Sequence, residues 1–598
     1  MPGPTRWRGE ALPHAVTSNK VKTHVLDERV RAVLKTIKLA AKSGVPENAP
    51  EGKLNRHEDH LLLRRAAAES VVLLKNEHKT LPFDRARPVA VIGPNAQLTT
   101  AYSGGGSASL LPYYTVTPHA GILAQAQSTV HYSLGSYGHK ELPLLGERLQ
   151  TYDGKPGFRF RVYDKPTSDS DRKLYQELHL THSYMLLFDH KVPDLEGSLY
   201  YIDIEAIFIP DEDGVFDFGL TVEGTARLFV DGQLVIDNAT HQRPGTAFFG
   251  NGTIEEIAAI DLEAGKAYSI RIEFGSAPTS TLQKAGTVSF GPGGLRIGGC
   301  KRIDPEAAIA EAVELASNVE QVVILAGLNG DWEGEGADRP HMDSPPYIDK
   351  LIDSVIAVNP KAVIIIQSGT PVSMPWADEA RAILQAWYGG NETGNAIADV
   401  LYGDVNPSGK LPMTFPRHLR DNPAFLNYRS ERGRVLYGED IYVGYRYYER
   451  LSLKPLFPFG HGLSYTTFRF SDLNVSITNA DARPSSSEAL VTVTFTIENT
   501  GKREGAEVAQ IYIQQCEPSI ARPIKELKGF EKVFLRPGEK QKVHVDMERK
   551  YACSFWDEGR DMWILEKGKY KVFVGNSSQA GFLEGEYDVK ETGWWNGL

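Results

Sequence analysis

The densest group of side chains that could carry out chemistry lies between residues 329 and 339, in the run Asn-Gly-Asp-Trp-Glu-Gly-Glu-Gly-Ala-Asp-Arg. It holds carboxylates, one tryptophan and one arginine: Asp331, Trp332, Glu333, Glu335, Asp338 and Arg339. Its glycines let the backbone bend and turn a carboxylate outward. A carboxyl group that is partly desolvated beside Trp332 has a raised pKa, as a general acid requires. Asp338 and Arg339 could form a local ion pair that fixes the loop. A solvated acidic turn is the alternative interpretation.

A second loop combines glycine with serine and follows an apolar run that ends at Gly93. We predict that this loop lies beside the substrate, through Ser103, Gly104, Gly105, Gly106 and Ser107. It contains no Gly-Lys-Ser/Thr, which excludes a nucleotide P-loop. A tight crossing or a flexible hairpin would also explain the glycines. The functional alternative is a loop that lets a sugar or a neighbouring domain approach closely.

Composition excludes several classes of function. The chain has 76 acidic and 65 basic residues, for a formal charge of -11, so a generally basic nucleic-acid binder is excluded. No apolar stretch approaches about 18 residues, so no transmembrane helix and no membrane partner is expected. Cys300, Cys516 and Cys553 have neither the number for a disulfide framework nor a metal-ligand spacing. No metal and no cofactor is expected, and no serine-hydrolase elbow is recognisable.

The elements that position the two loops alternate between strands and helices. Short apolar runs at 88–94, 321–327 and 361–369 are typical of buried parallel strands. Helical patterns cover 305–317 and 344–357. This alternation predicts a parallel α/β sheet, whose ligands bind where the strands end. The acidic run directly follows the second of these strands.

Two regions have the alternating pattern of antiparallel strands instead. Between about 150 and 298, runs such as 158–163 and 226–235 alternate and are separated by turn residues. We therefore expect a β-sandwich inserted into the α/β domain. From residue 466 onward, about seven short strands predict a second sandwich. Near the start, helices are predicted over 27–42 and 60–76, with more apolar surface than they can bury against each other.

Several motifs together resemble glycoside hydrolase family 3, in the family's order and over nearly the whole chain. They lie at 66–77, 81–82, 91–96, 332–339, 403–412, 442–448 and 457–465. The inserted domain resembles the protective-antigen-type β-sandwich of one β-glucosidase branch. The C-terminal region resembles the fibronectin type III-like module of the same enzymes.

The resemblance implies a retaining β-glucosidase acting on cellobiose and on oligo- and aryl β-glucosides, in cellulose or glycan degradation. Such enzymes pair a nucleophile with an acid/base carboxylate. By resemblance the acid/base is Glu335, in Glu-Gly-Ala-Asp-Arg, with Glu333 as the alternative. Trp332, Asp338 and Arg339 would support the loop. No cofactor is implied, and a homo-oligomer is possible. A non-catalytic carbohydrate- or partner-binding paralogue is the competing hypothesis.

The chain departs from the family pattern at its beginning. It contains neither the Ser-Asp-Trp that carries the family's nucleophile nor the Lys-His pair that holds sugar hydroxyls. We therefore expect a chain truncated at its N-terminus, with a barrel of about 250 residues missing. An isolated chain of this kind would be inactive. Secretion and a cytoplasmic location both stay open.

The expected fold class is α/β plus β. Residues 1–85 are predicted to be a remnant of the end of a (β/α) barrel with linker helices, and 86–149 with 299–425 an α/β sandwich domain. The inserted protective-antigen-type β-sandwich covers 150–298. A connecting segment covers 426–465, and the fibronectin type III-like domain covers 466–598.

Overall fold

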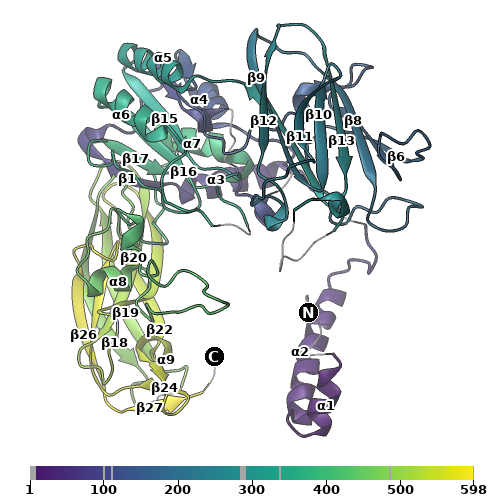
Figure 1. Cartoon of the computed structure of the whole chain (residues 1–598). Coiled ribbons are helices and arrows are strands. Elements are labelled where there is room, and N and C mark those ends of the chain that lie inside the picture. Colours follow the sequence, from purple (N-terminus) through teal and green to yellow (C-terminus); the bar gives the residue numbers. More distant parts are fainter. Residues whose placement is uncertain are drawn as a thin grey trace. The chain divides into compact units, whose positions relative to one another are not determined.

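The computed structural model describes residues 9–50, 52–97, 102–109, 112–282, 291–335, 338–483 and 486–596. The chain separates into two compact units, Met1–His57 and Glu58–Leu598. The first unit contains α1 (Ala11–Thr17) and α2 (Thr23–Ala41), labelled in Figure 1. α2 begins at Thr23, ahead of residue 27, where the predicted helix was expected to start. Its apolar side chains at Val30, Val33 and Leu34 are exposed.

A six-stranded sheet forms the centre of the second unit, in the order β1-β17-β16-β15-β2-β3. The strands are β1 (Val72–Asn76), β2 (Val89–Ile92), β3 (Val130–Ser133), β15 (Gln321–Gly327), β16 (Val363–Gln367) and β17 (Ala382–Gln385). Neighbouring strands from β17 to β3 are parallel, and β1 pairs antiparallel with β17. The predicted strands β2, β15 and β16 are confirmed and lie next to one another.

The helix predicted over 60–76 is wrong in its second half. α3 (His57–Ser70) ends before Val71, and the apolar run that follows forms β1. Val72 and Leu73 are fully buried in the sheet, so burial between two helical layers decides their conformation rather than local periodicity. The sheet therefore includes residues ahead of position 86, where the α/β domain was expected to begin. The origin of residues 1–85 as a barrel remnant stays a prediction.

Helices cover both faces of this sheet. On one face, α5 (Pro305–Asn318) and α6 (Ile348–Val358) share a core with alternate side chains of β2, β15 and β16. On the other face, α3, α4 (Pro118–Gln125) and α7 (Thr393–Tyr402) share a second core. Arg64 of α3 forms a bidentate salt bridge with Asp399 of α7, with hydrogen bonds of 2.7 and 2.5 Å.

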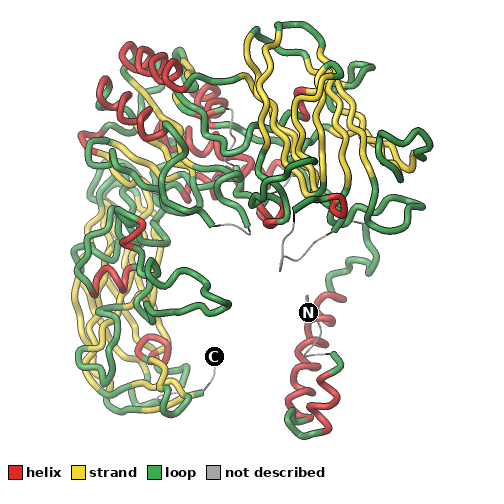
Figure 2. Tube along the Cα trace, viewed as in Figure 1, coloured by secondary structure: helices red, strands yellow, loops and turns green. Residues whose placement is uncertain are grey.

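The inserted region consists of two antiparallel sheets around one core (Figure 2). The first sheet contains β4 (Leu149–Gln150), β5 (Phe158–Tyr163), β6 (Leu174–Leu180), β8 (Tyr201–Phe208), β10 (Thr225–Val230), β11 (Gln233–Asn238) and β13 (Tyr268–Gly275). The second contains β7 (Tyr184–Leu186), β9 (Gly214–Glu223), β12 (Glu256–Leu262) and β14 (Gly294–Lys301). Antiparallel strands therefore occupy the region where they were expected, and its protective-antigen type stays a prediction.

The C-terminal region is also β-rich. One sheet joins β18 (Phe468–Thr478), β19 (Leu490–Asn499) and β22 (Lys540–Glu548). A second joins β20 (Gly505–Gln515), β21 (Glu526–Leu535), β25 (Gly568–Gly575) and β26 (Leu583–Val589), and the two share one core. A small third sheet contains β23 (Phe555–Asp557), β24 (Met562–Leu565) and β27 (Gly593–Trp595). The short helices are α8 (Tyr445–Arg450) and α9 (Arg549–Cys553).

Two of the motifs behind the family resemblance join the α/β domain to this region. Lys410 and Glu507 form a buried ion pair at 2.6 Å. His461 lies 2.8 Å from the Leu74 carbonyl oxygen, and Gln510 donates to the Gly460 carbonyl oxygen at 3.0 Å. These motif residues therefore have a structural role at the joint between domains.

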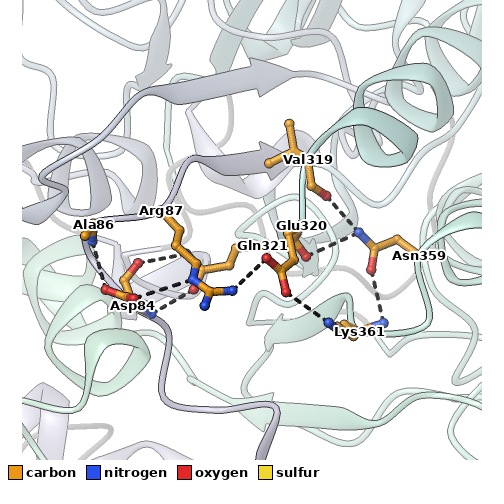
Figure 3. Close-up of polar contacts among 8 residues, drawn as sticks. All are labelled: Asp84, Ala86, Arg87, Val319, Glu320, Gln321, Asn359 and Lys361. Atoms are coloured by element: carbon orange, nitrogen blue, oxygen red, sulfur yellow. Dashed lines mark hydrogen bonds and ion pairs between the residues drawn. The ribbon is translucent and has the colours of Figure 1, made fainter.

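The amino-terminal ends of the central strands are held by a polar network (Figure 3). The Asn359 amide donates to the Val319 carbonyl oxygen at 2.9 Å and accepts from Lys361 N–H at 3.1 Å. Glu320 bridges Arg87 and Lys361, at 2.7 and 3.0 Å. This network holds the edge of the sheet opposite the acidic loop. Within the described ranges, no helix is long and apolar enough to cross a membrane.

Candidate active site

The acidic loop begins where β15 ends, at the carboxyl-terminal edge of the sheet. Asn329 is buried and accepts from Asp331 N–H at 2.9 Å through its side-chain oxygen. The Trp332 indole N–H donates to the Gly138 carbonyl oxygen at 2.7 Å, and its ring packs against the core beside α5 and α6. Trp332 therefore anchors the loop, and its role in supporting the catalytic residue stays a prediction.

The structure brings the Gly/Ser loop against the acidic loop, although the two are more than 200 residues apart in sequence. Glu335 is exposed, and its Oε2 accepts from Ser107 N–H at 3.0 Å and from the Ser107 hydroxyl. Gly105 N–H donates to the Glu333 carbonyl oxygen at 2.7 Å. The approach requires glycine, because a Cβ at Gly106 would lie 2.6 Å from Glu335 N. Ser103 and Gly104 lie in the same described stretch.

The pKa of Glu335 differs from the sequence-based expectation. The Ser107 hydroxyl and then the Ser107 N–H lower it from the usual value, because both stabilise the charged form. Burial beside Trp332 would have raised it, but Glu335 is solvent-exposed and the Trp332 indole N–H is bonded to Gly138. Glu335 is therefore an accessible, ionised carboxylate in this arrangement.

Glu333, the alternative candidate, is held by three donors. Its carboxylate accepts from Gly369 N–H at 2.6 Å and from the hydroxyls of Thr370 and Tyr388. Burial, and then the Glu333 charge, raises the pKa of Tyr388 far above its usual range. Glu333 clamps the acidic loop to the segment that follows β16, and its oxygens are occupied. This geometry favours Glu335 as the carboxylate that meets a substrate.

The two remaining supporting residues contact different partners. Arg339 donates through Nη2 to the Thr370 hydroxyl and to the Pro371 carbonyl oxygen, both at 2.9 Å, and burial lowers its pKa. Asp338 is exposed, and its hydrogen bond raises the pKa of Tyr428. Both residues are described, and no ion pair joins them, so the expected local pair is not formed. Residues 336–337 lie outside the described residues.

Sequence reasoning missed the partners that come from distant segments. The most prominent is Arg296 of β14, whose Nη2 lies 3.9 Å from Asp331 Oδ1 in the acidic loop. Gly138, Thr370 and Tyr388 also hold this loop, from positions that carry no local signal of a site. Within the described ranges, no group of His, Cys, Asp and Glu side chains is arranged to hold a metal ion.

Comparisons with known proteins match the whole length of the chain. Residues 71–465 match the glycosyl hydrolase family 3 C-terminal domain, and 507–578 match a fibronectin type III-like domain. Probable beta-glucosidase I of Aspergillus fumigatus is 56% identical over 598 residues, covering 100% of this chain and 71% of that protein. Probable beta-glucosidase J of Neosartorya fischeri is 56% identical over 615 residues, with the same coverage.

Solved structures agree with these sequence matches. The beta-glucosidase of Kluyveromyces marxianus in complex with glucose is 42% identical, with a TM-score of 0.90. The match covers 100% of this chain and 71% of that one. DesR, a beta-glucosidase of Streptomyces venezuelae in complex with D-glucose, is 28% identical with a TM-score of 0.64, covering 97% of this chain and 66% of its own.

Proposed function

Since this chain belongs to glycoside hydrolase family 3, we propose that Glu335 is the acid/base carboxylate of a retaining β-glucosidase. The relatives named above are β-glucosidases, and they do not favour the non-catalytic alternative. The observation that carries the assignment is the contrast between two neighbours. Glu335 is exposed and, among the described residues, its carboxylate is held by Ser107 alone, whereas the Glu333 carboxylate is occupied by three donors.

In the proposed chemistry one carboxyl group acts first as a general acid and then as a general base. In the first step, protonated Glu335 gives its proton to the glycosidic oxygen while a second carboxylate attacks the anomeric carbon. In the second step, ionised Glu335 takes a proton from the water that cleaves the glycosyl-enzyme. The two Ser107 donors favour the ionised form. Bound substrate must therefore displace or outweigh them before the first step.

The substrate class proposed is a terminal, non-reducing β-D-glucosyl residue in cellobiose or in oligo- and aryl β-glucosides. The Gly/Ser loop from Ser103 to Ser107 is proposed to face the sugar, because it already contacts the acid/base candidate. The inserted domain is proposed to be of the protective-antigen type and to shape the entrance to the site. Deleting 150–298 is then expected to change the preference between short and long β-glucosides.

The second carboxylate is the remaining requirement. The sequence contains no Ser-Asp-Trp, the motif by which the family resemblance identifies the nucleophile. We propose that the 598-residue polypeptide alone turns over negligibly, because without a nucleophile no glycosyl-enzyme forms. The test is hydrolysis of 4-nitrophenyl β-D-glucoside by the purified chain. Turnover that Glu335→Gln abolishes would overturn this part of the proposal and leave the acid/base role intact.

A further inference from the structure

Arg296 is a buried cation that faces carboxylates from three separate parts of the chain. It belongs to β14 of the inserted domain and is 5% exposed. Its Nη1 lies 2.9 Å from Glu255 Oε1, and its Nε lies 3.0 Å from Glu141 Oε2. Its Nη2 donates to the Leu142 carbonyl oxygen at 2.6 Å and lies 3.9 Å from Asp331 Oδ1. One guanidinium therefore joins the inserted domain, the segment 141–142 and the acidic loop.

The inserted sheet is shaped to hold Glu255 against this cation. Gly219 of β9 and Gly298 of β14 are direct neighbours across the two strands. A Cβ at Gly219 would lie 2.6 Å from Glu255 Cδ, and a Cβ at Gly298 would lie 2.9 Å from Glu255 Oε1. The paired glycines thus leave the space that the Glu255 carboxylate fills. The other Glu255 oxygen accepts from Leu142 N–H at 2.9 Å.

The segment from Gly138 to Leu142 contacts both Arg296 and the acidic loop. Its Gly138 carbonyl oxygen accepts from the Trp332 indole, and its Glu141 N–H donates to the Asp331 carboxylate. Burial raises the pKa of Asp331, and Arg296 opposes that shift. Asp331 is only four residues from Glu335, so its position limits where Glu335 can lie.

We propose that Arg296 is a positioning residue, which ties the inserted domain to Asp331 and so holds the loop that carries Glu335. The inference rests on the proposed acid/base role of Glu335 for its functional meaning. The inserted domain then has a part in the geometry of catalysis besides shaping the entrance.

Amide hydrogen exchange of the full chain, followed by mass spectrometry, tests this directly. Arg296→Met and Asp331→Asn are compared with the unmodified chain. The matched control is Arg302→Met, which removes a cation that directly follows β14. The partner of Arg302 is Asp217, at 2.6 Å, which lies within the inserted domain. We expect exchange in 328–335 to become about tenfold faster in the first two variants, as loss of a charge-assisted contact implies. Exchange in β15 should not change in any of these variants, and exchange in 328–335 should not change in Arg302→Met.

A third variant disturbs the contact without removing any charge. Gly219→Ala places a methyl group where the Glu255 carboxylate lies and should shift Glu255 and Arg296 together. We expect it to accelerate exchange in 328–335 as well, and it keeps the test decisive if Arg296→Met fails to fold. Unchanged loop exchange in folded Asp331→Asn and Gly219→Ala would overturn the proposal. So would faster exchange confined to the inserted strands, which indicates a merely structural role.

The exchange measurement does not depend on catalytic activity, so it tests the role of Arg296 separately from the role of Glu335. If Glu335 is not the acid/base, the activity of Glu335→Gln in this chain joined to the unmatched part of a β-glucosidase relative reveals it, while the exchange result stands. If Arg296 does not hold the loop, the exchange result reveals it whatever the activity.

Discussion

Ser107 donates both its backbone N–H and its hydroxyl to one carboxylate oxygen of Glu335, from a loop 228 residues away in the sequence. This double contact keeps the pKa of Glu335 below its usual value and holds its carboxylate at the carboxyl-terminal edge of the sheet. The contact links two motifs that sequence reasoning had singled out separately.

Removing the Ser107 hydroxyl should raise the pKa of Glu335 toward its ordinary value. In Ser107→Ala the backbone donor remains, but the larger of the two stabilising contacts with the charged form is lost. The pKa can be followed by NMR titration of ¹³C-labelled glutamate, with the Glu335 signal identified by its loss in Glu335→Gln. Ser109→Ala, in the same loop, is the control. An unmoved pKa in Ser107→Ala, or an equal shift in Ser109→Ala, would contradict the account.

Gly106→Ala should separate the two loops. Gly106 has a φ of +68°, and an added Cβ would lie 2.6 Å from Glu335 N, so backbone must move. We expect a loss of about 1–2 kcal/mol in the free energy of unfolding from the left-handed backbone conformation, and a raised pKa of Glu335 from the broken contact. Gly232→Ala is the matched control, because Gly232 has a φ of +79° with no atom within 4 Å of the added Cβ. The control should lose stability without changing the pKa of Glu335, and a pKa shift in both variants would refute the prediction.

Amide substitution should cost more stability at Glu333 than at Glu335. Glu333→Gln leaves donors from Gly369, Thr370 and Tyr388 facing an amide group, and should cost about 1–3 kcal/mol of stability. Glu335→Gln weakens an exposed contact with Ser107 and should therefore lower the melting temperature less than Glu333→Gln does. Differential scanning calorimetry of the two variants measures this difference. A larger loss in Glu335→Gln than in Glu333→Gln would show that the structural roles had been exchanged.

Glu255 should make stability depend on pH. Burial raises the pKa of Glu255 to about 7, against the opposing charge of Arg296 and the Leu142 N–H, while Glu141 and Asp331 raise it further. The folded state therefore binds more protons than the unfolded state between the usual glutamate pKa of 4.5 and about 7. It follows that stability falls as pH rises through this window.

Urea denaturation at a series of pH values checks the sign. Glu255→Gln cannot ionise, so its stability should fall less steeply across this window than that of the unmodified chain. Glu256→Gln, at the neighbouring position, is the control, since Glu256 is the partner of Arg243 rather than of Arg296. Parallel pH profiles for the unmodified chain and Glu255→Gln would contradict the prediction.

Elements with one strong pattern could be predicted from the sequence, and contacts between distant segments could not. β5 begins and ends where its alternation indicates, because one of its faces is buried. β15 and β16 are buried on both faces and read as continuous apolar runs. β1 was mistaken for helix because Val71 to Leu74 fit either structure, and only the pairing with β17 decides between them.

In the candidate site, too, local features could be predicted from the sequence and contacts between distant segments could not. Glu335 and its glycines form one local run, so the sequence could mark the run as a candidate site, whereas the choice of Glu335 within it came from the family resemblance and stays a prediction. Its lowered pKa depends on Ser107, and the position of its loop depends on Arg296, through side chains that only the fold brings together. No pattern around Arg296 marks it as different from other arginines in β strands.

The acid/base role of Glu335 is tested most directly in a complete active site. This chain can be joined to the part of one of its β-glucosidase relatives that it does not match, and kcat measured for cellobiose and for 4-nitrophenyl β-D-glucoside. We predict that Glu335→Gln lowers kcat for cellobiose about 100- to 10,000-fold, and that added azide restores turnover of the nitrophenyl substrate with formation of β-glucosyl azide. Unchanged turnover in Glu335→Gln, or azide rescue of Glu333→Gln instead, would contradict it.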